Sequence, residues 1–360
     1  MTTLSLAMIV KDAEPTLARA LKSVSDACDE LVVVDTGSLD RSVEIARQMG
    51  AKIHRFDWID DFAAARNCSF EHCQSEWILW LDADDVISEQ SLRRLLEVKS
   101  TSCHEAIDGI FMPYQYAFTS NGKCELTLYR ERLLRRQAGL RWNYPVHECI
   151  YVPPERALYV HDIFIEHRQT QESRANKQPG RNLKILEKAL SRGERSERNL
   201  FYYGNELRDH GRYEESVVVH KQFLECGGRL CDRYWATRGV SKCYCALEQP
   251  DQALAWGLLA TELDPQRAEA FNDVGIIHYT QDRISEAITF FIAAAKLQKP
   301  QRSFVEDCHY GWLPYDYLSS CYLSTGEYQK ALESGLKALP DSPDKDRSEK
   351  NIEFLQRLVR

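Results

Sequence analysis

Three aspartates follow one of the most hydrophobic stretches of the chain, in the sequence WILWLDADDV of residues 77–86. They are Asp82, Asp84 and Asp85, and burying an unpaired carboxylate costs several kcal/mol. A cation, or solvent at the end of a strand, would compensate this cost. If the backbone stays extended, Asp82 and Asp84 lie on the same side of the chain and can share a divalent cation. The spacing therefore predicts a ligand or metal site after a buried strand, with Asp85 as a structural neighbour.

Further polar residues stand where apolar stretches end or where a helix is predicted to begin. Asp35 ends the stretch ELVVVD, and Arg66 lies in DDFAAARN, shortly before the aspartates. Glu148 lies beside His147 in RWNYPVHECIY, and His167 ends the stretch IFIEH. A carboxylate can accept a proton, and an imidazole can bind a metal ion or a phosphate. Glu148 and His167 also have structural interpretations: Glu148 as a surface glutamate, and His167 as a histidine that caps a strand.

The first half of the chain alternates short apolar stretches with helical patterns. The predicted strands cover residues 4–10, 30–40, 51–58 and 77–85, and the predicted helices cover residues 16–28, 41–50 and 62–73. Strands separated by helices of about a dozen residues predict an α/β domain with a mostly parallel sheet covered on both faces. Ligands of such sheets bind beyond the carboxyl ends of the strands, where Lys11, Asp35 and the three aspartates would lie. Residues 106–118 and 123–136 predict strands of a more irregular α+β region.

From about residue 197 onward, small residues recur at matching offsets. Pairs of alanines seven residues apart occur in three stretches, as Ala253 and Ala260, Ala287 and Ala294, and Ala331 and Ala338. The first two pairs are 34 residues apart, and a weaker copy begins near Tyr202. A 34-residue period of paired helices is typical of tetratricopeptide repeats, in which small residues let the helices approach closely. The sequence therefore predicts an all-α solenoid, with about ten extra residues around SFVEDCHYGW as an inserted loop before the last copy.

Four motifs together resemble those of family 2 glycosyltransferases with the GT-A fold. They are LSLAMIVKDAE, VVVDTGSLD, DDFAAARN and WILWLDADD, and they occur here in the order and spacing of that family. The resemblance covers residues 4–90 closely and residues 105–170 loosely, and such domains followed by tetratricopeptide-like repeats are a familiar arrangement. It implies a GT-A nucleotide-sugar-binding domain over residues 1–170, a linker or connecting helix over residues 171–196, and tetratricopeptide-like helical repeats over residues 197–360.

The resemblance also implies a role for each polar residue of the first motifs. Asp35 would bind the base or the ribose of a nucleotide-sugar, with Glu14 nearby. Asp84 would ligate Mn²⁺ or Mg²⁺, and Asp82 would contact the ribose, or the metal through water. Arg66 would position the acidic pair or the diphosphate. The metal would neutralise the negative charge that grows on the nucleoside diphosphate as it leaves.

Two later residues complete the implied site. Glu148 is the candidate for the carboxylate that takes a proton from the acceptor in an inverting transfer, and similar His-Glu pairs occur near this point in relatives. His167 is a candidate third ligand of the metal, or a phosphate ligand. The chain departs from the family pattern at Asp12 and at Leu39, where Asn and Thr are usual. These departures leave the finer nucleotide contacts open.

The expected function is that of a metal-dependent, inverting hexosyltransferase. The expected donor is a UDP-sugar, and the acceptor is a peptide or protein, or a saccharide, in or near the repeat groove, because such grooves commonly hold extended peptides. Two alternatives stay open, namely transfer to a hydroxylated base in DNA and a non-catalytic nucleotide-sugar-binding scaffold. The net charge of −8 disfavours nucleic acid, whereas the arginines between Arg130 and Arg141 favour it, unless they pair with carboxylates along a strand. A homodimer is also left open.

The composition agrees with a globular protein of two domains. The chain has 360 residues, of which 44% are hydrophobic and 28% charged. No apolar stretch approaches the roughly 18 residues of a membrane span, and the N-terminus MTTLSLAMIVKDAEP lacks the basic start of a signal peptide. The 12 cysteines show no paired zinc spacing, which favours small buried apolar residues over a disulfide framework. A cytoplasmic location is therefore expected.

Overall fold

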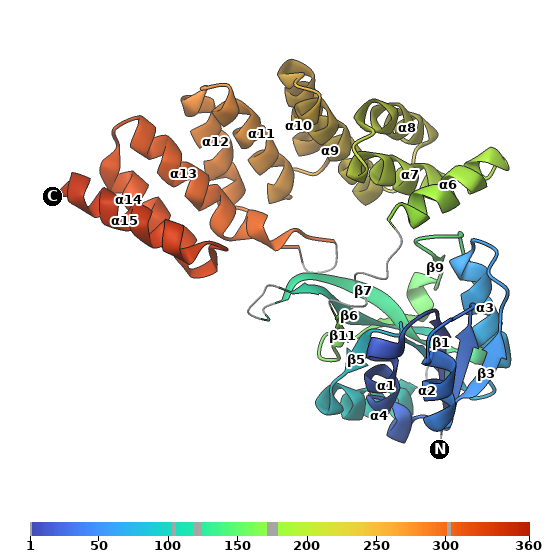
Figure 1. The fold of residues 1–360 in the computed structure, drawn as a ribbon. Coiled ribbons are helices and arrows are strands. Elements are labelled where there is room, and N and C mark those ends of the chain that lie inside the picture. The colour runs from blue at the N-terminus through green and yellow to red at the C-terminus, as the bar shows by residue number, and fades with distance from the viewer. Residues whose placement is uncertain (1, 103–105, 119–121, 123, 171–178, 301–303) are drawn as a thin grey trace. The chain divides into compact units, whose positions relative to one another are not determined.

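The computed structural model describes residues 2–102, 106–118, 122, 124–170, 179–300 and 304–360 (Figure 1). The chain forms two compact units, Met1–Arg192 and Gly193–Arg360. The first unit contains a mixed sheet with helices and the second consists of helices, so the predicted α/β domain followed by an all-α solenoid is confirmed. The predicted boundaries at residues 170 and 197 stay predictions. Residues 171–178 of the predicted linker lie outside the described residues.

The described residues of the first unit form a nine-stranded sheet in the order β3-β2-β1-β4-β7-β6-β11-β5, with β10 paired to β6. Its strands are β1 (Leu4–Val10), β2 (Glu30–Asp35), β3 (Lys52–Arg55), β4 (Trp77–Trp80), β5 (Asp85–Ile87), β6 (Gly109–Phe118), β7 (Cys124–Arg135), β10 (Ala157–Tyr159) and β11 (Ile165–His167). β1 to β4 run parallel, as predicted. β7 runs antiparallel to β4 and β6, so the complete sheet is mixed. A separate antiparallel pair consists of β8 (Trp142–Asn143) and β9 (Cys149–Ile150).

Helices cover both faces of this sheet because the side chains of each strand alternate between two hydrophobic cores. Among the described residues, the α-helices of the unit are α1 (Glu14–Lys22), α2 (Ser42–Gln48), α3 (Phe62–His72), α4 (Glu89–Ser102) and α6 (Arg181–Ser191). Leu6 and Met8 of β1 face a core shared with α1, α2 and α4. Ala7 of β1 and Trp80 of β4 face the other core, which includes Ala63 of α3. The predicted cover on both faces is therefore confirmed.

Several predicted elements have different bounds in the structure. The strand predicted over residues 77–85 is interrupted, because β4 ends at Trp80 and the chain turns before β5 begins at Asp85. The helix predicted over residues 16–28 begins at Glu14 and ends at Lys22. The helix before Gly50 ends at Gln48, and Gly50 has a φ of 78°, a left-handed conformation that glycine adopts without strain.

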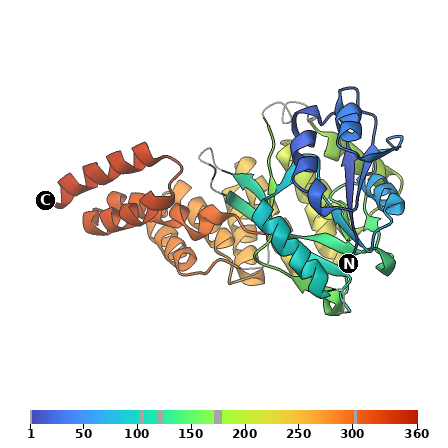
Figure 2. The ribbon, with the colours of Figure 1, turned by 90° about the horizontal axis from the view of Figure 1, so that it is seen from below.

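The second unit is a row of antiparallel helix pairs followed by a final helix (Figure 2). The pairs are α7 (Glu197–Asp209) with α8 (Tyr213–Cys226), α9 (Leu230–Ala246) with α10 (Pro250–Leu263), α11 (Ala268–Thr280) with α12 (Ile284–Ala295), and α13 (Trp312–Ser324) with α14 (Tyr328–Ala338). The final helix is α15 (Lys345–Val359), and a short 3₁₀ helix, η4 (Asp307–Tyr310), precedes α13. The predicted tetratricopeptide-like repeats are confirmed.

Small residues 12 positions apart join the two helices of each pair. These positions are Gly204 and Ser216, Ser241 and Ala253, Gly275 and Ala287, and Ser319 and Ala331. The Ser216 hydroxyl donates to the Gly204 carbonyl at 2.7 Å, Ser241 donates to Ala253 at 2.7 Å, and Ser319 donates to Ala331 at 2.8 Å. The recurring alanines thus mark close helix packing, as the sequence predicts.

Within the part of the chain that the structure describes, none of the helices combines the length and the apolar character that crossing a membrane requires.

Candidate functional site

The candidate site lies where the strands of the sheet end. Asp35 is the last residue of β2 and pairs in register with Val10 at the end of β1. Asp82 follows the end of β4 by two residues, and His167 is the last residue of β11. Because β11 runs antiparallel to β5, His167 stands opposite Asp85, the first residue of β5. The fold therefore brings together residues that are 82 positions apart in the sequence.

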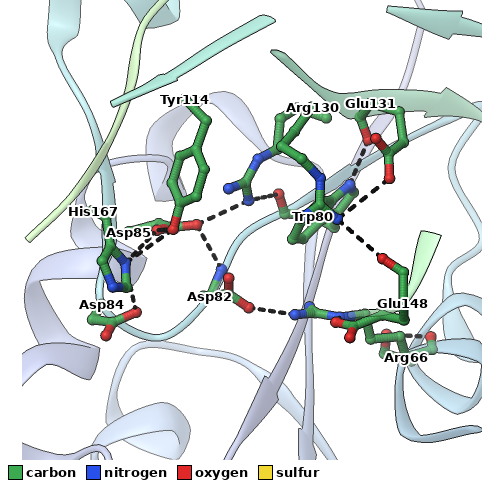
Figure 3. Close-up of polar contacts among 12 residues, drawn as sticks. Arg66, Trp80, Asp82, Asp84, Asp85, Tyr114, Arg130, Glu131, Glu148 and His167 are labelled. Carbon is green, nitrogen blue, oxygen red and sulfur yellow. Dashed lines mark hydrogen bonds and ion pairs between the residues drawn. The ribbon is translucent and has the colours of Figure 1, made fainter. Parts of the chain in front are cut away.

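The three aspartates do not form an extended D-x-D segment. The backbone N–H of Asp85 donates to the Asp82 carbonyl at 2.9 Å, which closes a turn, and the N–H of Asp82 donates to the Asp85 carboxylate at 3.0 Å. As a result Asp82 and Asp84 point to different partners, as Figure 3 shows. The condition under which Asp82 and Asp84 would share a cation, an extended backbone, is not met in this structure.

Asp84, Asp85 and His167 form a compact cluster. The Nδ1 atom of His167 lies 3.3 Å from a carboxylate oxygen of Asp84 and 3.3 Å from one of Asp85. Burial alone would lower the pKa of His167, but the two carboxylates outweigh this effect and raise its pKa to about 9. One ligand atom from each of the three residues lies within 4.8 Å of the other two. Carboxylate oxygens and an imidazole nitrogen suit Mn²⁺ and accept Mg²⁺, so these residues fit the expected ion.

A buried network supports this cluster from behind. Asp85 and Arg132 of β7 are both fully buried, and the guanidinium Nη1 lies 2.9 Å from the Asp85 carboxylate. The Tyr114 hydroxyl donates to the other Asp85 oxygen at 2.8 Å and lies 2.9 Å from Nδ1 of His167. The Arg132 guanidinium also stacks on the rings of Trp80 and Tyr114, 3.8 Å and 4.2 Å from their centroids. Asp85 is thus more than a structural neighbour, because it carries the contact from Arg132 to His167.

Arg66 of α3 joins Asp82 to Glu148. Its Nη2 atom lies 2.6 Å from an Asp82 oxygen, and its Nε atom lies 2.6 Å from an oxygen of Glu148. Burial alone would raise the pKa of both carboxyl groups, but the guanidinium outweighs it and holds both pKa values below their usual range. Both groups are therefore carboxylates at neutral pH. The structure brings these three predicted residues together, beside the Asp84–His167 cluster (Figure 3).

Two tryptophans hold the guanidinium of Arg66 in place. It stacks over the rings of Trp80, 4.6 Å from the centroid, and Trp142, 5.2 Å from the centroid. Such contacts contribute about 0.5–2 kcal/mol each when they are desolvated. Arg130 of β7 also lies over Trp80 and donates to the main-chain carbonyl of Glu148 at 3.4 Å. Arg66 thus pairs with a carboxylate at each of two nitrogens and has two tryptophan rings beside its guanidinium, which fits a residue that positions carboxylates.

The arginines between Arg130 and Arg141 mostly pair with carboxylates. Arg132 pairs with Asp85, Arg135 with Glu76 at 2.9 Å, and Arg141 with Glu71 at 2.5 Å. These contacts agree with the structural interpretation of the run. Because these arginines are paired with carboxylates, they no longer favour a DNA acceptor.

The expected nucleotide contacts are Asp35, the last residue of β2, and Glu14, the first residue of α1. The Asp35 carboxylate accepts hydrogen bonds from the backbone N–H groups of Gly37 and Ser38, and Glu14 accepts one from the N–H of Arg41 at 3.1 Å. Asp12, where the family usually has Asn, accepts a hydrogen bond from the N–H of Leu39 at 2.7 Å. The two departures from the family pattern are therefore in contact with each other.

Sequence reasoning missed the residues that support the site. Arg132 and Tyr114 contact Asp85 only because β6 and β7 join the sheet beside β4, and a sequence pattern does not show that pairing. Trp80 is a buried core residue, and three arginine side chains also lie over its ring. The charged residues Arg130, Glu131 and Arg132 inside the predicted strand sequence LTLYRERLL were the available signal, because a buried charge needs a partner.

Comparison with protein families supports the resemblance seen in the motifs. Residues 5–166 match the family model described as "Glycosyl transferase family 2". The chain is 39% identical over 155 residues to the TPR repeat-containing protein Synpcc7942_0270 of Synechococcus elongatus, which covers 42% of this chain and 36% of that protein. It is 26% identical over 272 residues to the SPbeta prophage-derived glycosyltransferase SunS of Bacillus subtilis, which covers 72% of this chain and 63% of SunS.

A third relative is the uncharacterized glycosyltransferase RT0209 of Rickettsia typhi, 29% identical over 153 residues, or 42% of this chain and 46% of that protein. The chain thus spans between about a third and two thirds of the length of these relatives.

Proposed function

We propose that the protein transfers a sugar from a nucleotide-sugar to an acceptor, because residues 5–166 match the family model described as "Glycosyl transferase family 2". A UDP-sugar is the expected donor, and a peptide or protein, or a saccharide, is the expected acceptor. The observation that carries the proposal is the cluster of Asp84, Asp85 and His167 at the strand ends, next to the ion-paired Arg66, Asp82 and Glu148. The predicted cytoplasmic location and the possibility of a homodimer stay predictions.

The donor would lie along the ends of β1, β2 and β4. We assign Asp35 and Glu14 to the base or ribose, and Asp84 and His167, with Asp85, to a divalent cation. A bound Mn²⁺ or Mg²⁺ would supply positive charge against the diphosphate leaving group. The predicted contact of Asp82 with the ribose, or with the metal through water, also stays a prediction. Arg66 neutralises Asp82 and holds it in one orientation.

We assign the proton transfer to Glu148. Its pKa is held low by Arg66, so it is ionised and can accept a proton from the acceptor as the acceptor bonds to the anomeric carbon. The bond between that carbon and the diphosphate oxygen breaks in the same displacement, which inverts the anomeric configuration. Arg66 touches Glu148 and Asp82 at once, so it fixes the distance between the base and the donor side.

The test is turnover of a panel of UDP-sugars and GDP-sugars, with Mn²⁺ and with a chelator, for the wild type and for Asp84→Ala. The wild type should hydrolyse or transfer from at least one donor only when the metal is present, and Asp84→Ala should lose at least tenfold in rate. Glu166→Gln is the matched control, because Glu166 is a neighbouring carboxylate paired with Arg168 outside the cluster. Turnover that is indifferent to metal and to Asp84→Ala would refute the metal assignment. If the protein binds no donor in calorimetry, the result would instead favour the alternative of a non-catalytic scaffold protein.

A further inference from the structure

The residues inserted between the third and fourth helix pairs lie against the first helices of earlier repeats. The described part of this insertion before α13 begins at Phe304, and we call residues Phe304–Tyr310 the inserted segment. It contacts α9 and α11, the first helices of the second and third pairs, through the hydrogen bonds and ion pairs described below. In Figure 1 it lies on the hollow side of the row of repeats, below α11 and α13. Repeats of this class bind partners on their concave side.

The face of α9 that receives the segment is separate from the face that packs on α10. Trp235, Arg238 and Lys242 are spaced three and four residues apart, so they share one face of the helix. Ser241 lies on the other face and bonds to α10. The helix pair is therefore complete without the inserted segment, because α9 contacts α10 and the segment with different sides.

Side chains of the repeats hold the segment in the way that a receptor holds a peptide. Asn272 of α11 donates to the main-chain carbonyl of His309 at 3.1 Å. Arg267, just before α11, donates to the carbonyl of Phe304. Two carbonyls of the segment, five residues apart, are thus bound by side chains that belong to the repeats. Because these contacts are made to main-chain carbonyls, they are possible for a peptide of any sequence, and they fix the position of the bound peptide.

Side chains of the segment also contact the repeats. His309 lies 3.1 Å from Arg238, and the Tyr310 hydroxyl donates to Glu269 at 2.7 Å. Glu306 and Phe304 make the contacts that the proposal uses. The Glu306 carboxylate lies 2.8 Å from Nη2 of the buried Arg238 and 3.9 Å from Nζ of Lys242. The Phe304 ring meets the Trp235 ring edge to face, with centroids 4.8 Å apart. An acidic residue two positions after an aromatic residue therefore matches one cation pair and one aromatic surface.

The face of α9 and α11 that receives the segment carries more cations than carboxylates of its own. Arg238 pairs with Asp273 of α11, and Arg267 pairs with Glu269 at 2.8 Å. Lys242 is the third cation of this face, and its carboxylate comes from Glu306. Without the segment, the face keeps both internal pairs and gains one uncompensated positive charge, so it attracts a carboxylate.

We propose that this face of α9 and α11 is a peptide-binding site, that the inserted segment is its intramolecular ligand, and that an external peptide with an aromatic residue two positions before a carboxylate competes for it. The proposal does not depend on transferase activity, because all of these residues belong to the second unit. The inserted segment then controls access to the groove.

In the experiment, a capped synthetic peptide of residues 304–311 that carries Cys308→Ser is titrated into the full chain, and calorimetry measures its binding. The hosts are the wild type and a Phe304→Ala/Glu306→Gln variant, whose own segment has lost the ring contact with Trp235 and the ion pair with Arg238. The peptide should bind the variant at least tenfold more tightly than the wild type, because the tethered segment competes at a high effective concentration. The peptide with Glu306→Gln should bind the variant at least tenfold more weakly. A Glu353→Gln/Phe354→Ala host, which changes the same residue types on the exposed side of α15, should behave as the wild type.

Two results would overturn the proposal. One is a folded variant that binds the peptide no better than the wild type does, and the other is a peptide whose affinity ignores Glu306→Gln. If the double variant fails to fold, Lys242→Glu in an otherwise native chain gives the second measurement. Amide hydrogens of residues 304–310 should then exchange at least tenfold faster while those of α9 and α11 keep their protection, and unchanged exchange would contradict the proposal.

Discussion

Arg132 and Asp85 form an ion pair in which neither side chain is exposed to solvent, with 2.9 Å between Nη1 and the carboxylate oxygen. The same carboxylate accepts the Tyr114 hydroxyl and faces His167. The positive charge of Arg132 therefore supports the candidate metal cluster from inside the domain. Such a pair stabilises a fold little compared with apolar residues, but a single buried partner left alone is costly. This pairing explains why Asp85 is tolerated in the core, while Asp82 pairs with Arg66 and Asp84 with His167.

Replacing Arg132 by Met should destabilise the first unit by about 3–5 kcal/mol, because Asp85 is then buried without its cation. Chemical unfolding followed by circular dichroism measures the change. The control is Arg93→Met, since Arg93 pairs with Glu89 on an exposed helix surface and its loss should leave stability nearly unchanged. Equal stability of the wild type and Arg132→Met would mean that the buried pair does not hold this part of the sheet.

His167→Ala should weaken Mn²⁺ binding at least tenfold, because it removes one of three ligand groups of the cluster. Calorimetric titration of the metal into the protein, without donor or acceptor, measures this directly. His161→Ala is the matched control, because His161 lies close to His167 in the sequence but contacts Tyr129 and not the cluster. If both variants bind Mn²⁺ as the wild type does, the ion is not held by His167.

Glu148→Gln should lower kcat by about 10²–10⁴-fold, because the amide keeps the shape of the side chain but cannot accept a proton. Donor affinity in calorimetry should change little, since Arg66 can still donate to the amide oxygen and keep its bond to Asp82. Glu155→Gln, on a surface turn, is the control for a lost charge. A proportional loss of donor affinity and rate would instead identify Glu148 as a residue that only positions Arg66.

The elements of the fold were accessible from sequence because strand and helix patterns depend on local periodicity. The alternation in LSLAMIV and the recurring alanines of the repeats each report which side of an element is buried, and the structure agrees with both. The parallel direction of β1 to β4 also followed from the sequence, because strands joined by helices form βαβ units. The short strands β8 and β9 carry too few residues to show a period, and they were not predicted.

The site was predictable as a set of residues but not as a set of contacts. Asp84 and His167 do meet, as their shared assignment to a metal requires. Asp82 turns away to Arg66, because the turn between Asp82 and Asp85 separates side chains that an extended chain would align. The Asp85 carboxylate that caps this turn also pairs with Arg132, which lies 47 residues away in the sequence and reaches it through the pairing of β4 with β7.

His220 of α8 makes the stability of the repeat unit depend on pH. Its ring is fully buried, both nitrogens are without a hydrogen-bond partner among the described residues, and Gly204 and Gly239 lie against it. Burial lowers its pKa to about 3. The unfolded chain takes up a proton near the ordinary pKa of about 6.5, whereas the folded chain does not.

Stability should therefore be complete above pH 6.5 and should be lost as the pH falls from 6.5 toward 3. Between pH 6.5 and pH 5 the loss from His220 alone should be about 2 kcal/mol, at about 1.36 kcal/mol for each pH unit. Chemical unfolding of the wild type and of His220→Phe at both pH values isolates this part, because the other titrating groups are common to both proteins. The wild type should lose about 2 kcal/mol more than the variant over this interval. A parallel loss in the two proteins would show that His220 already carries a proton in the folded state.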